Sequence, residues 1–153
     1  MRRLTLAVAV LALAACSKKD ETPAVDTAAA AVTATPEVQP LSLSELAGEW
    51  NVVAKNDAGD SVLTSYVMNA TADGNWTITF PNRAPIKAAA SVSGDSVMTH
   101  AGPYASVLRK GVQVTTDAVM RLQDGKLIGK TTAHYNVKTA DSIRIINSEG
   151  TRK

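Results

Sequence analysis

Apolar and polar residues alternate with a period of two along most of the chain, a pattern typical of β-strands that bury one face. Residues 112–137 show this most clearly, with apolar residues at every second position on both sides of Asp124-Gly125. Asp-Gly favours a two-residue type I′ turn. Such a turn places Leu122 opposite Leu127, so the apolar residues of both strands share one face. The segment therefore predicts a β-hairpin.

Two further turns are predicted by requiring that the apolar residues of both strands of a hairpin lie on one face. A three-residue loop at Ala72–Gly74 places Met68 opposite Ile78, whereas a two-residue loop would put the apolar residues on opposite faces. A two-residue type II′ turn at Gly94-Asp95 also keeps the apolar residues of its two strands together. We therefore expect eight strands, at roughly Glu49–Lys55, Ser61–Thr71, Asn75–Phe80, Ile86–Ser93, Ser96–Ala101, Val112–Gln123, Lys126–Val137 and Ser142–Ser148.

The order of these strands predicts an all-β fold. No helix-length apolar stripe separates them, so every connection is a hairpin. One antiparallel sheet of this size buries its apolar face by closing into an up-and-down β-barrel, and a sandwich of two sheets is the alternative. The three tight turns lie at one end of such a barrel, and the longer connections lie at the other, more open end: residues 55–60, 81–85, 102–111 and 138–141.

A short helical turn precedes the first strand. Ser42 and Glu45 have capping-box spacing, and Gly48 is a natural helix stop. By the parity of the loops, this turn enters at the end that carries the tight hairpins. We therefore expect it to plug that end, with Trp50 as the first residue of the barrel floor.

The opening Gly48-Glu49-Trp50, placed after a short helix and before the first meander strand, resembles the lipocalin (calycin) superfamily. The resemblance implies a lipocalin-like barrel with the short helix closing one end. It also implies that an arginine on or after the last strand packs over Trp50. Arg152 is the better positional match to that role, and Arg144 is the second.

The N-terminus reads as an export signal. Two arginines and an apolar run occupy residues 1–15, and the run is too short to span a bilayer. The only cysteine, Cys16, follows Leu-Ala-Ala, which resembles the bacterial lipobox whose thiol is diacylated. Ser17 in the next position implies sorting to the outer membrane. We expect a lipoprotein signal peptide (1–15), a lipidated Cys16, a disordered Ala/Thr/Pro linker (16–40) and a barrel domain (41–153) that faces the periplasm.

The charge and the cysteine content of the chain limit the kinds of binding partner that we expect. Without Arg2 and Arg3, the 16 basic residues fall to 14 and equal the 14 acidic residues. A formally neutral mature chain does not favour nucleic-acid binding, which needs a clustered basic face. One thiol cannot build a disulfide framework. We expect a membrane partner through the lipid, no nucleic acid, and a monomer.

Catalytic residues are sparse in the expected barrel. Its only histidines, His100 and His134, are isolated, and the registers point both outward on different strands. A catalytic triad needs an oriented base, and a zinc site needs more ligands. We therefore expect no enzyme activity, no metal and no cofactor.

Ligand binding at the open end is the favoured function. Inward residues are large on the first three strands and mostly small on strands four to seven, which fits either a solid core or a pocket. A basic rim over an apolar cup suits a fatty acid or another hydrophobic or anionic amphiphile. Tyr104, in the longest loop, serves either as a lid contact or as an anchor of that loop. The expected ligand-binding residues are Lys55, Tyr66, Arg83, Ala88, Ala90, Tyr104, Arg109, Lys110 and Thr131.

Two functions without a small ligand remain open. The Leu-Ala-Gly-x-Trp opening resembles periplasmic metalloprotease inhibitors, which insert an extended N-terminal segment into a protease cleft, although those proteins carry a disulfide that this chain lacks. A packed barrel displayed on a tether to an envelope protein is the other alternative. The outward residues Met98, Val119 and Ile128 would seed such a contact surface.

Overall fold

The computed structural model describes residues 40–153. The expected signal peptide, the lipidation site Cys16 and nearly all of the expected linker lie outside the described residues. Within residues 40–153, no helix is long and apolar enough to cross a membrane.

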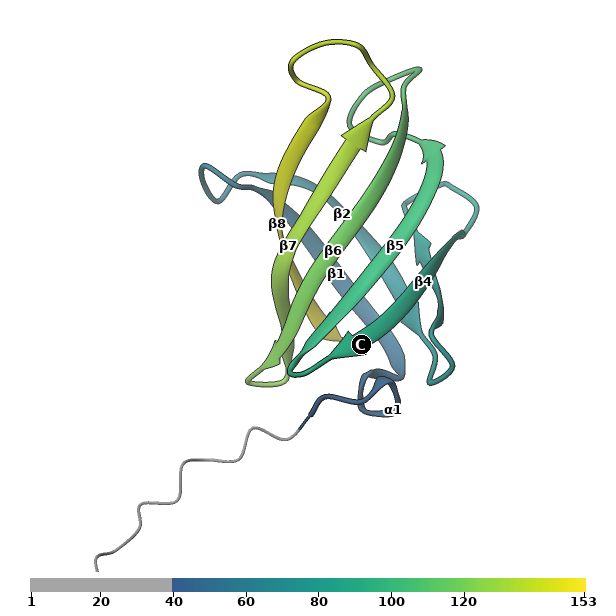
Figure 1. Cartoon of the computed structure of the whole chain (residues 1–153), viewed down its shortest axis with the longest axis vertical. Helices are drawn as coiled ribbons and strands as arrows, with labels where there is room; N and C mark the ends of the chain where they lie inside the picture. The colour runs from purple at the N-terminus through teal and green to yellow at the C-terminus, as the bar shows by residue number, and fades with distance from the viewer. Residues whose placement is uncertain (1–39) are drawn as a thin grey trace, which may run out of the picture. The chain divides into compact units, whose positions relative to one another are not determined.

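The described residues form a closed barrel of eight antiparallel strands, as predicted, and not a two-sheet sandwich (Figure 1). Each strand pairs with the next, and β1 pairs with β8 to close the sheet. The elements are α1 (Leu43–Leu46), β1 (Gly48–Asn56), β2 (Val62–Ala70), β3 (Asn75–Thr79), β4 (Ile86–Ser93), β5 (Ser96–Ala105), β6 (Gln113–Gln123), β7 (Lys126–Tyr135) and β8 (Ile143–Arg152).

The hairpin registers agree with the predictions from turn chemistry. Leu122 pairs with Leu127 across the Asp124-Gly125 turn, where both turn residues have the positive φ that a type I′ turn requires. Met68 pairs with Ile78, which confirms the three-residue loop. The β4–β5 register is confirmed as well, with Val92 opposite Val97, Ala90 opposite Thr99 and Ala88 opposite Ala101.

One end of the barrel, the helix end, carries α1 together with the three tight hairpins (Figure 1). The Ser42 hydroxyl accepts a hydrogen bond from the Glu45 N–H, and the Glu45 carboxylate accepts one from the Ser42 N–H, which confirms the capping box. The Trp50 indole N–H donates to the Leu46 carbonyl at 2.8 Å. These bonds fix the short helix against the first strand.

Arg152, not Arg144, packs over Trp50. Its guanidinium carbon lies 4.4 Å from the centre of the Trp50 ring, and its Nη atoms donate to the carbonyls of Ala47 and Glu45. Arg152 is the last residue of β8, which continues beyond its expected end at Ser148. The extension pairs with β1 and ties the last strand to the plug at the helix end.

β5 also extends past its expected end at Ala101. It continues through Gly102-Pro103 to Ala105, with a shift of register between Ala101 and Tyr104. Gly-Pro suggests the start of a loop because proline lacks an N–H for the ladder. The strand accommodates it with an irregularity, and Gly102 at φ +121 lies so close to β6 that a Cβ would be 2.8 Å from the Val114 carbonyl oxygen. Tyr104 therefore belongs to β5 and not to a loop.

Candidate ligand-binding cavity

The barrel interior is solid toward the helix end and hollow toward the opposite end, which we call the loop end. Trp50, Trp76 and Met68 are fully buried at the helix end and pack against the small residues Ala88, Ala101 and Ala118. Large residues on one wall thus fill the space left by small residues on the other, as close packing requires. The solid-core alternative is therefore right for the helix end only.

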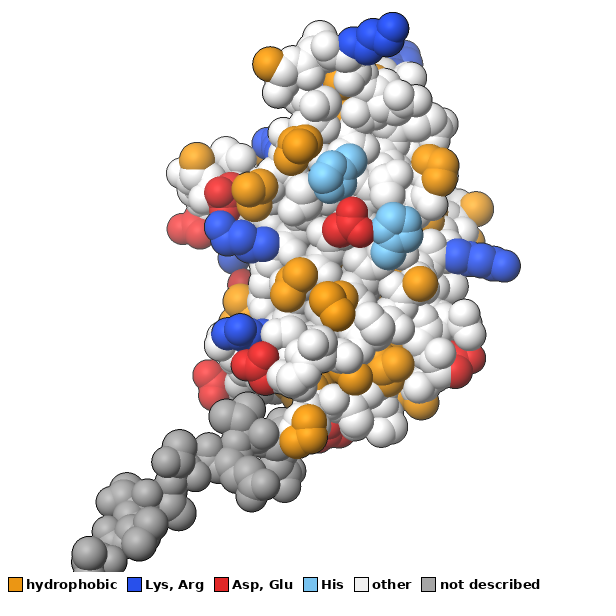
Figure 2. Space-filling view, viewed as in Figure 1, with side chains coloured by type: hydrophobic (Ala, Val, Ile, Leu, Met, Phe, Trp, Pro, Cys, Tyr) orange, Lys and Arg blue, Asp and Glu red, His pale blue; other side chains and the backbone are white. Residues whose placement is uncertain are grey.

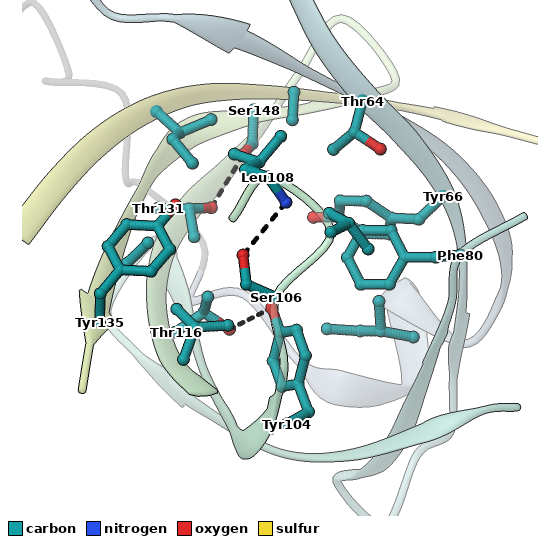
Figure 3. Close-up of a pocket in the computed structure, with 16 residues that line it drawn as sticks. Thr64, Tyr66, Phe80, Tyr104, Ser106, Leu108, Thr116, Thr131, Tyr135 and Ser148 are labelled. Atoms are coloured by element: carbon teal, nitrogen blue, oxygen red, sulfur yellow. Dashed lines mark hydrogen bonds between the residues drawn. The ribbon is translucent and has the colours of Figure 1, made fainter. Parts of the chain in front are cut away.

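An internal cavity of about 50 Å³ lies at the loop end. There Ala54, Ala133 and several threonine and serine residues face one another, and no tryptophan fills the gap between them. By this measure the cavity holds about three to five water molecules. Its lining residues are Ala54, Thr64, Tyr66, Ile78, Phe80, Tyr104, Ser106, Val107, Leu108, Val114, Thr116, Thr131, Ala133, Tyr135, Ile146 and Ser148 (Figure 3).

Hydroxyl groups from five strands meet at this cavity. The buried Thr131 and Ser148 hydroxyls, on β7 and β8, are 2.8 Å apart. The Tyr104 hydroxyl on β5 lies 3.5 Å from Thr116 Oγ1 on β6, and Tyr66 enters from β2 (Figure 3). The cavity thus has apolar walls marked by discrete hydrogen-bonding groups, which is the usual composition of a small-molecule site.

Two of the three tyrosines that line the cavity, Tyr66 and Tyr104, keep their protons. Burial raises the pKa of Tyr66 well above its usual range, and the neighbouring Tyr104 raises it further, while Ser148 offsets only part of the shift. Burial likewise raises the pKa of Tyr104. Both phenols are therefore neutral near pH 7 and act as hydrogen-bonding groups, not as bases.

The connection between β5 and β6, residues 106–112, covers the loop end of the cavity, and we call it the β5–β6 loop. Val107 and Leu108 contribute to the cavity lining and are only half-buried. Ser106 is buried, and its hydroxyl accepts the backbone N–H groups of Leu108 and Arg109 at 3.1 and 3.0 Å. This local turn holds the loop over the opening.

Two arginines expected to bind ligand instead fasten this loop. Arg83, between β3 and β4, donates to the carbonyl of Ala105 and to that of Ser106 at 3.2 Å. Arg109 pairs with the Asp141 carboxylate at 2.9 Å and lies 4.1 Å from the centre of the Tyr135 ring. Their guanidinium groups thus bind protein oxygens, and neither side chain lines the cavity. At this cavity the two arginines therefore hold the loop, and their contact with a ligand stays a prediction.

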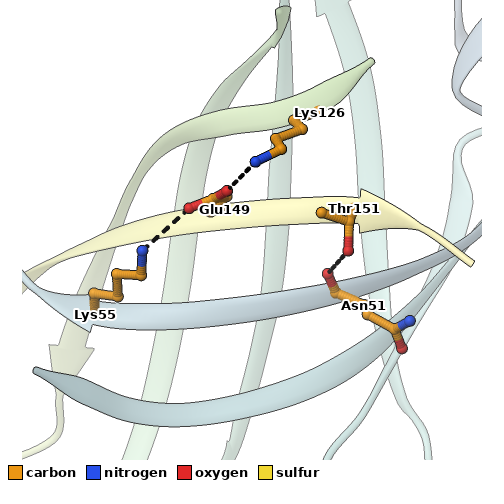
Figure 4. A network of polar contacts seen from close by, with 5 residues as sticks. All are labelled: Asn51, Lys55, Lys126, Glu149 and Thr151. Atoms are coloured by element: carbon orange, nitrogen blue, oxygen red, sulfur yellow. Dashed lines mark hydrogen bonds and ion pairs between the residues drawn. The ribbon is translucent and has the colours of Figure 1, made fainter. Parts of the chain in front are cut away.

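Lys55 and Lys110 do not line the cavity either. Lys55 Nζ pairs with Glu149 at 3.1 Å on the outer wall, where Glu149 also binds Lys126 at 2.8 Å (Figure 4). Since Trp50, Val52 and Ala54 point inward on β1, alternation puts Lys55 outside. Lys110 is exposed in the β5–β6 loop. The expected basic rim is therefore mostly engaged in contacts within the protein.

Ala88 and Ala90 point into the barrel but lie nearer the helix end than the cavity does. Ala88 pairs with Trp76 and is buried in the core near the helix end, and Ala90 packs against the same cluster. β4 begins at the loop end with Ile86 and runs toward the helix end, so these alanines lie beyond the cavity. Alternation gives the face of a residue but not its height along the barrel, so the contact of these alanines with a ligand stays a prediction that this cavity does not support.

Three predicted residues do line the cavity: Tyr66, Tyr104 and Thr131. Tyr104 packs beside Phe80, with ring centres 6.1 Å apart, and acts as part of the wall rather than as a lid. Tyr135, Thr116 and Ser148 were missed as site residues. The register that aligns Val114 with Tyr135 could have found the first, since it places that ring at the loop end of the hairpin.

The two histidines are not isolated. On the outer face His100 Nδ1 lies 2.7 Å from Asp117 Oδ1, and His134 Nε2 lies 3.6 Å from Asp117 Oδ2. Both are outward as predicted, and Figure 2 shows the carboxylate between the two imidazoles with scattered apolar side chains around them. Within residues 40–153, no group of three or more His, Cys, Asp or Glu side chains has the arrangement of a metal site.

The fold and the cavity together define the structural class of this protein. It is a closed eight-stranded antiparallel barrel with a small hydroxyl-lined interior space at one end. No protein-family model, no curated protein and no solved structure matches the chain.

Proposed function

We propose that this barrel is a binding protein that holds a small molecule in the cavity at its loop end. The observation that carries the proposal is the contrast between a fully packed helix end and a hollow loop end lined by hydroxyl groups. Barrels of this size either fill with side chains or hold one small ligand. A loop fastened over the space by Arg83 and Arg109 fits a site that encloses its ligand.

We also propose that the chain is a lipocalin-like lipoprotein of the outer membrane, with its barrel in the periplasm. Leu-Ala-Ala-Cys16 behind an export signal supports the anchor. The Gly48-Glu49-Trp50 opening and the packing of Arg152 on Trp50 support the lipocalin-like family. The Leu41 N–H donates to the Gly94 carbonyl, so the chain enters the barrel at the helix end, opposite the cavity.

Native mass spectrometry of the full chain tests the binding function. The protein is purified in one detergent of known mass, because the proposed lipid anchor requires it, alongside two variants with the same Ala→Leu substitution; an added mass equal to that of the detergent is not counted as ligand. Ala133→Leu fills the cavity, because Ala133 is buried in its wall. Ala89→Leu adds the same atoms to the exposed face of β4 and serves as the control.

We expect an added mass of one small molecule on the wild type and on Ala89→Leu, and none on Ala133→Leu. Circular dichroism checks that Ala133→Leu keeps its β-structure. A wild type that is bare as purified, and that stays bare when small neutral and anionic compounds are added, would contradict the proposal. That result would favour the protein-interaction alternatives.

A further inference from the structure

The chemistry of the cavity wall restricts its ligand. All 16 lining side chains are uncharged, and the polar ones offer only hydroxyl groups: Thr64, Tyr66, Tyr104, Ser106, Thr116, Tyr135, Thr131 and Ser148. A site that uses charge to hold its ligand places at least one cation or anion in the wall. This wall instead suits a ligand that is recognised through neutral hydrogen bonds.

The hydroxyls keep free hydrogen-bonding capacity. Each hydroxyl has one donor and two acceptor positions. Thr131 and Ser148 share one hydrogen bond and Ser148 also interacts with Tyr66, so several of the lone pairs of these hydroxyls remain available. The Tyr104–Thr116 contact, at 3.5 Å, is long for a hydroxyl pair and leaves both groups open to a better partner. A ligand hydroxyl can accept from one group and donate to another.

A carboxylate would find no cation to pair with in the wall of this space. Neutral hydroxyl groups compensate for less of the cost of burying an ionised carboxylate than a cation does. Arg83 and Arg109 already bind backbone carbonyls and Asp141, and Lys110, the other cation of the β5–β6 loop, is exposed and does not line the cavity. The neutral tyrosines add no positive charge. The cavity therefore disfavours the head group of a fatty acid.

Size restricts the ligand as well. Pockets for drug-sized molecules measure about 300–1,000 Å³, and a cavity that binds benzene measures about 150 Å³. The space here is about 50 Å³. A six-membered ring enters only when the half-buried Leu108 side chain withdraws from the cavity, since the strand residues of the wall are held by the barrel.

We propose that the cavity selects a compact, uncharged molecule with an apolar body and a hydroxyl or carbonyl group, and that it rejects carboxylates. The polar group lies among Thr131, Ser148 and Thr116, and the apolar body lies against Phe80 and Ile146 in the place that Leu108 vacates. This inference rests on the proposed binding function and narrows it.

Three probes of similar size separate the effects of a hydroxyl group, an apolar ring and a carboxylate charge on binding. They are phenol, toluene and benzoate. Each is titrated by calorimetry into the full chain and into Leu108→Ala, which enlarges the cavity without changing the barrel wall. We expect phenol to bind at least about tenfold more tightly than benzoate, and Leu108→Ala to bind phenol more tightly than the wild type does. Toluene, which lacks the hydroxyl, binds more weakly than phenol by about three- to tenfold.

Two hydroxyl deletions test the polar contact in the Leu108→Ala background. Thr131→Val and Thr116→Val keep the side-chain shape, and we expect at least one of them to weaken phenol binding several-fold while leaving toluene binding unchanged. Equal effects on both probes would mean that the substitution acts on packing and would overturn the assignment of the polar contact.

The outcomes distinguish this inference from the function beneath it. If none of the three probes binds either protein, the cavity is not a ligand site, and both the proposed function and this inference fail. If benzoate binds as tightly as phenol, or toluene binds as tightly as phenol, the ligand class is wrong while the binding function stands.

Discussion

Gly129 shows how tightly single residues are constrained in this barrel. It lies in the middle of β7, opposite Met120 of β6. A Cβ atom there would lie 2.0 Å from the Val119 carbonyl oxygen and 2.6 Å from the Met120 Cα. These are backbone atoms of a central strand, so no side chain can rotate away to make room. Glycine at this position is what lets the two strands approach.

We therefore expect Gly129→Ala to lower the free energy of unfolding by about 3 kcal/mol, at the upper end of the usual effect of overpacking. Gly59→Ala is the control, because Gly59 has no atom within 4 Å of an added Cβ. Urea denaturation of both variants measures the difference. Equal stabilities would show that the close approach of β7 to β6 is wrong.

Asp73 gives a pH-dependent test of the β2–β3 loop. Hydrogen bonds from Thr71 and then from Asn75 lower the pKa of Asp73 to about 2. A lowered folded-state pKa means that the ionised form stabilises the fold, fully at pH values above the ordinary Asp pKa of about 3.9. That contribution disappears as the pH falls from about 4 to about 2.

Asp73→Asn cannot titrate, so its stability relative to the wild type should depend on pH. We expect the advantage of the wild type to be greatest above pH 5 and to shrink as the pH falls toward 2. Thermal unfolding of both proteins across that range measures it. A constant difference in melting temperature would contradict the hydrogen-bonded ionised carboxylate.

At the scale of elements, turn chemistry was a better guide than strand composition. Asp124-Gly125 and Gly94-Asp95 gave the right registers because the turn type fixes the pairing of every residue beyond it. Gly102-Pro103 wrongly predicted the end of the fifth strand at Ala101, since β5 passes through this pair with a local irregularity. Whether a Gly-Pro pair ends a strand or bends it depends on the neighbouring strand, which the local sequence does not reveal.

The β5–β6 loop is the element on which access to the cavity depends. We expect Arg83→Met to increase hydrogen exchange in residues 106–112 several-fold, because the side chain no longer holds the carbonyls of Ala105 and Ser106. Lys87→Met removes an exposed charge from the outer face of β4 and is the matched control. Unchanged exchange in the Arg83 variant would show that the loop is held in another way.

At the scale of the whole molecule, parity and closure were predictable and the site was only partly so. Counting hairpins placed the short helix and the longer loops at opposite ends of the barrel. The same reasoning assigned ligand-binding roles to Arg83 and Arg109, whose partners lie on other loops. Loops at one end of a barrel come into contact only because the sheet closes on itself. The period-two pattern predicts which face a strand residue occupies and does not predict contacts between loops.

The central claim is that a ligand binds inside the loop end and not on the outer face. β8 tests this directly, because Ile146 lines the cavity while its neighbour Ile145 is exposed outside. Methyl NMR of the full chain during a phenol titration reports on both residues. We predict saturable shifts at Ile146 and Ala133 with Ile145 unchanged; shifts confined to Ile145 and Ile143 would contradict the account.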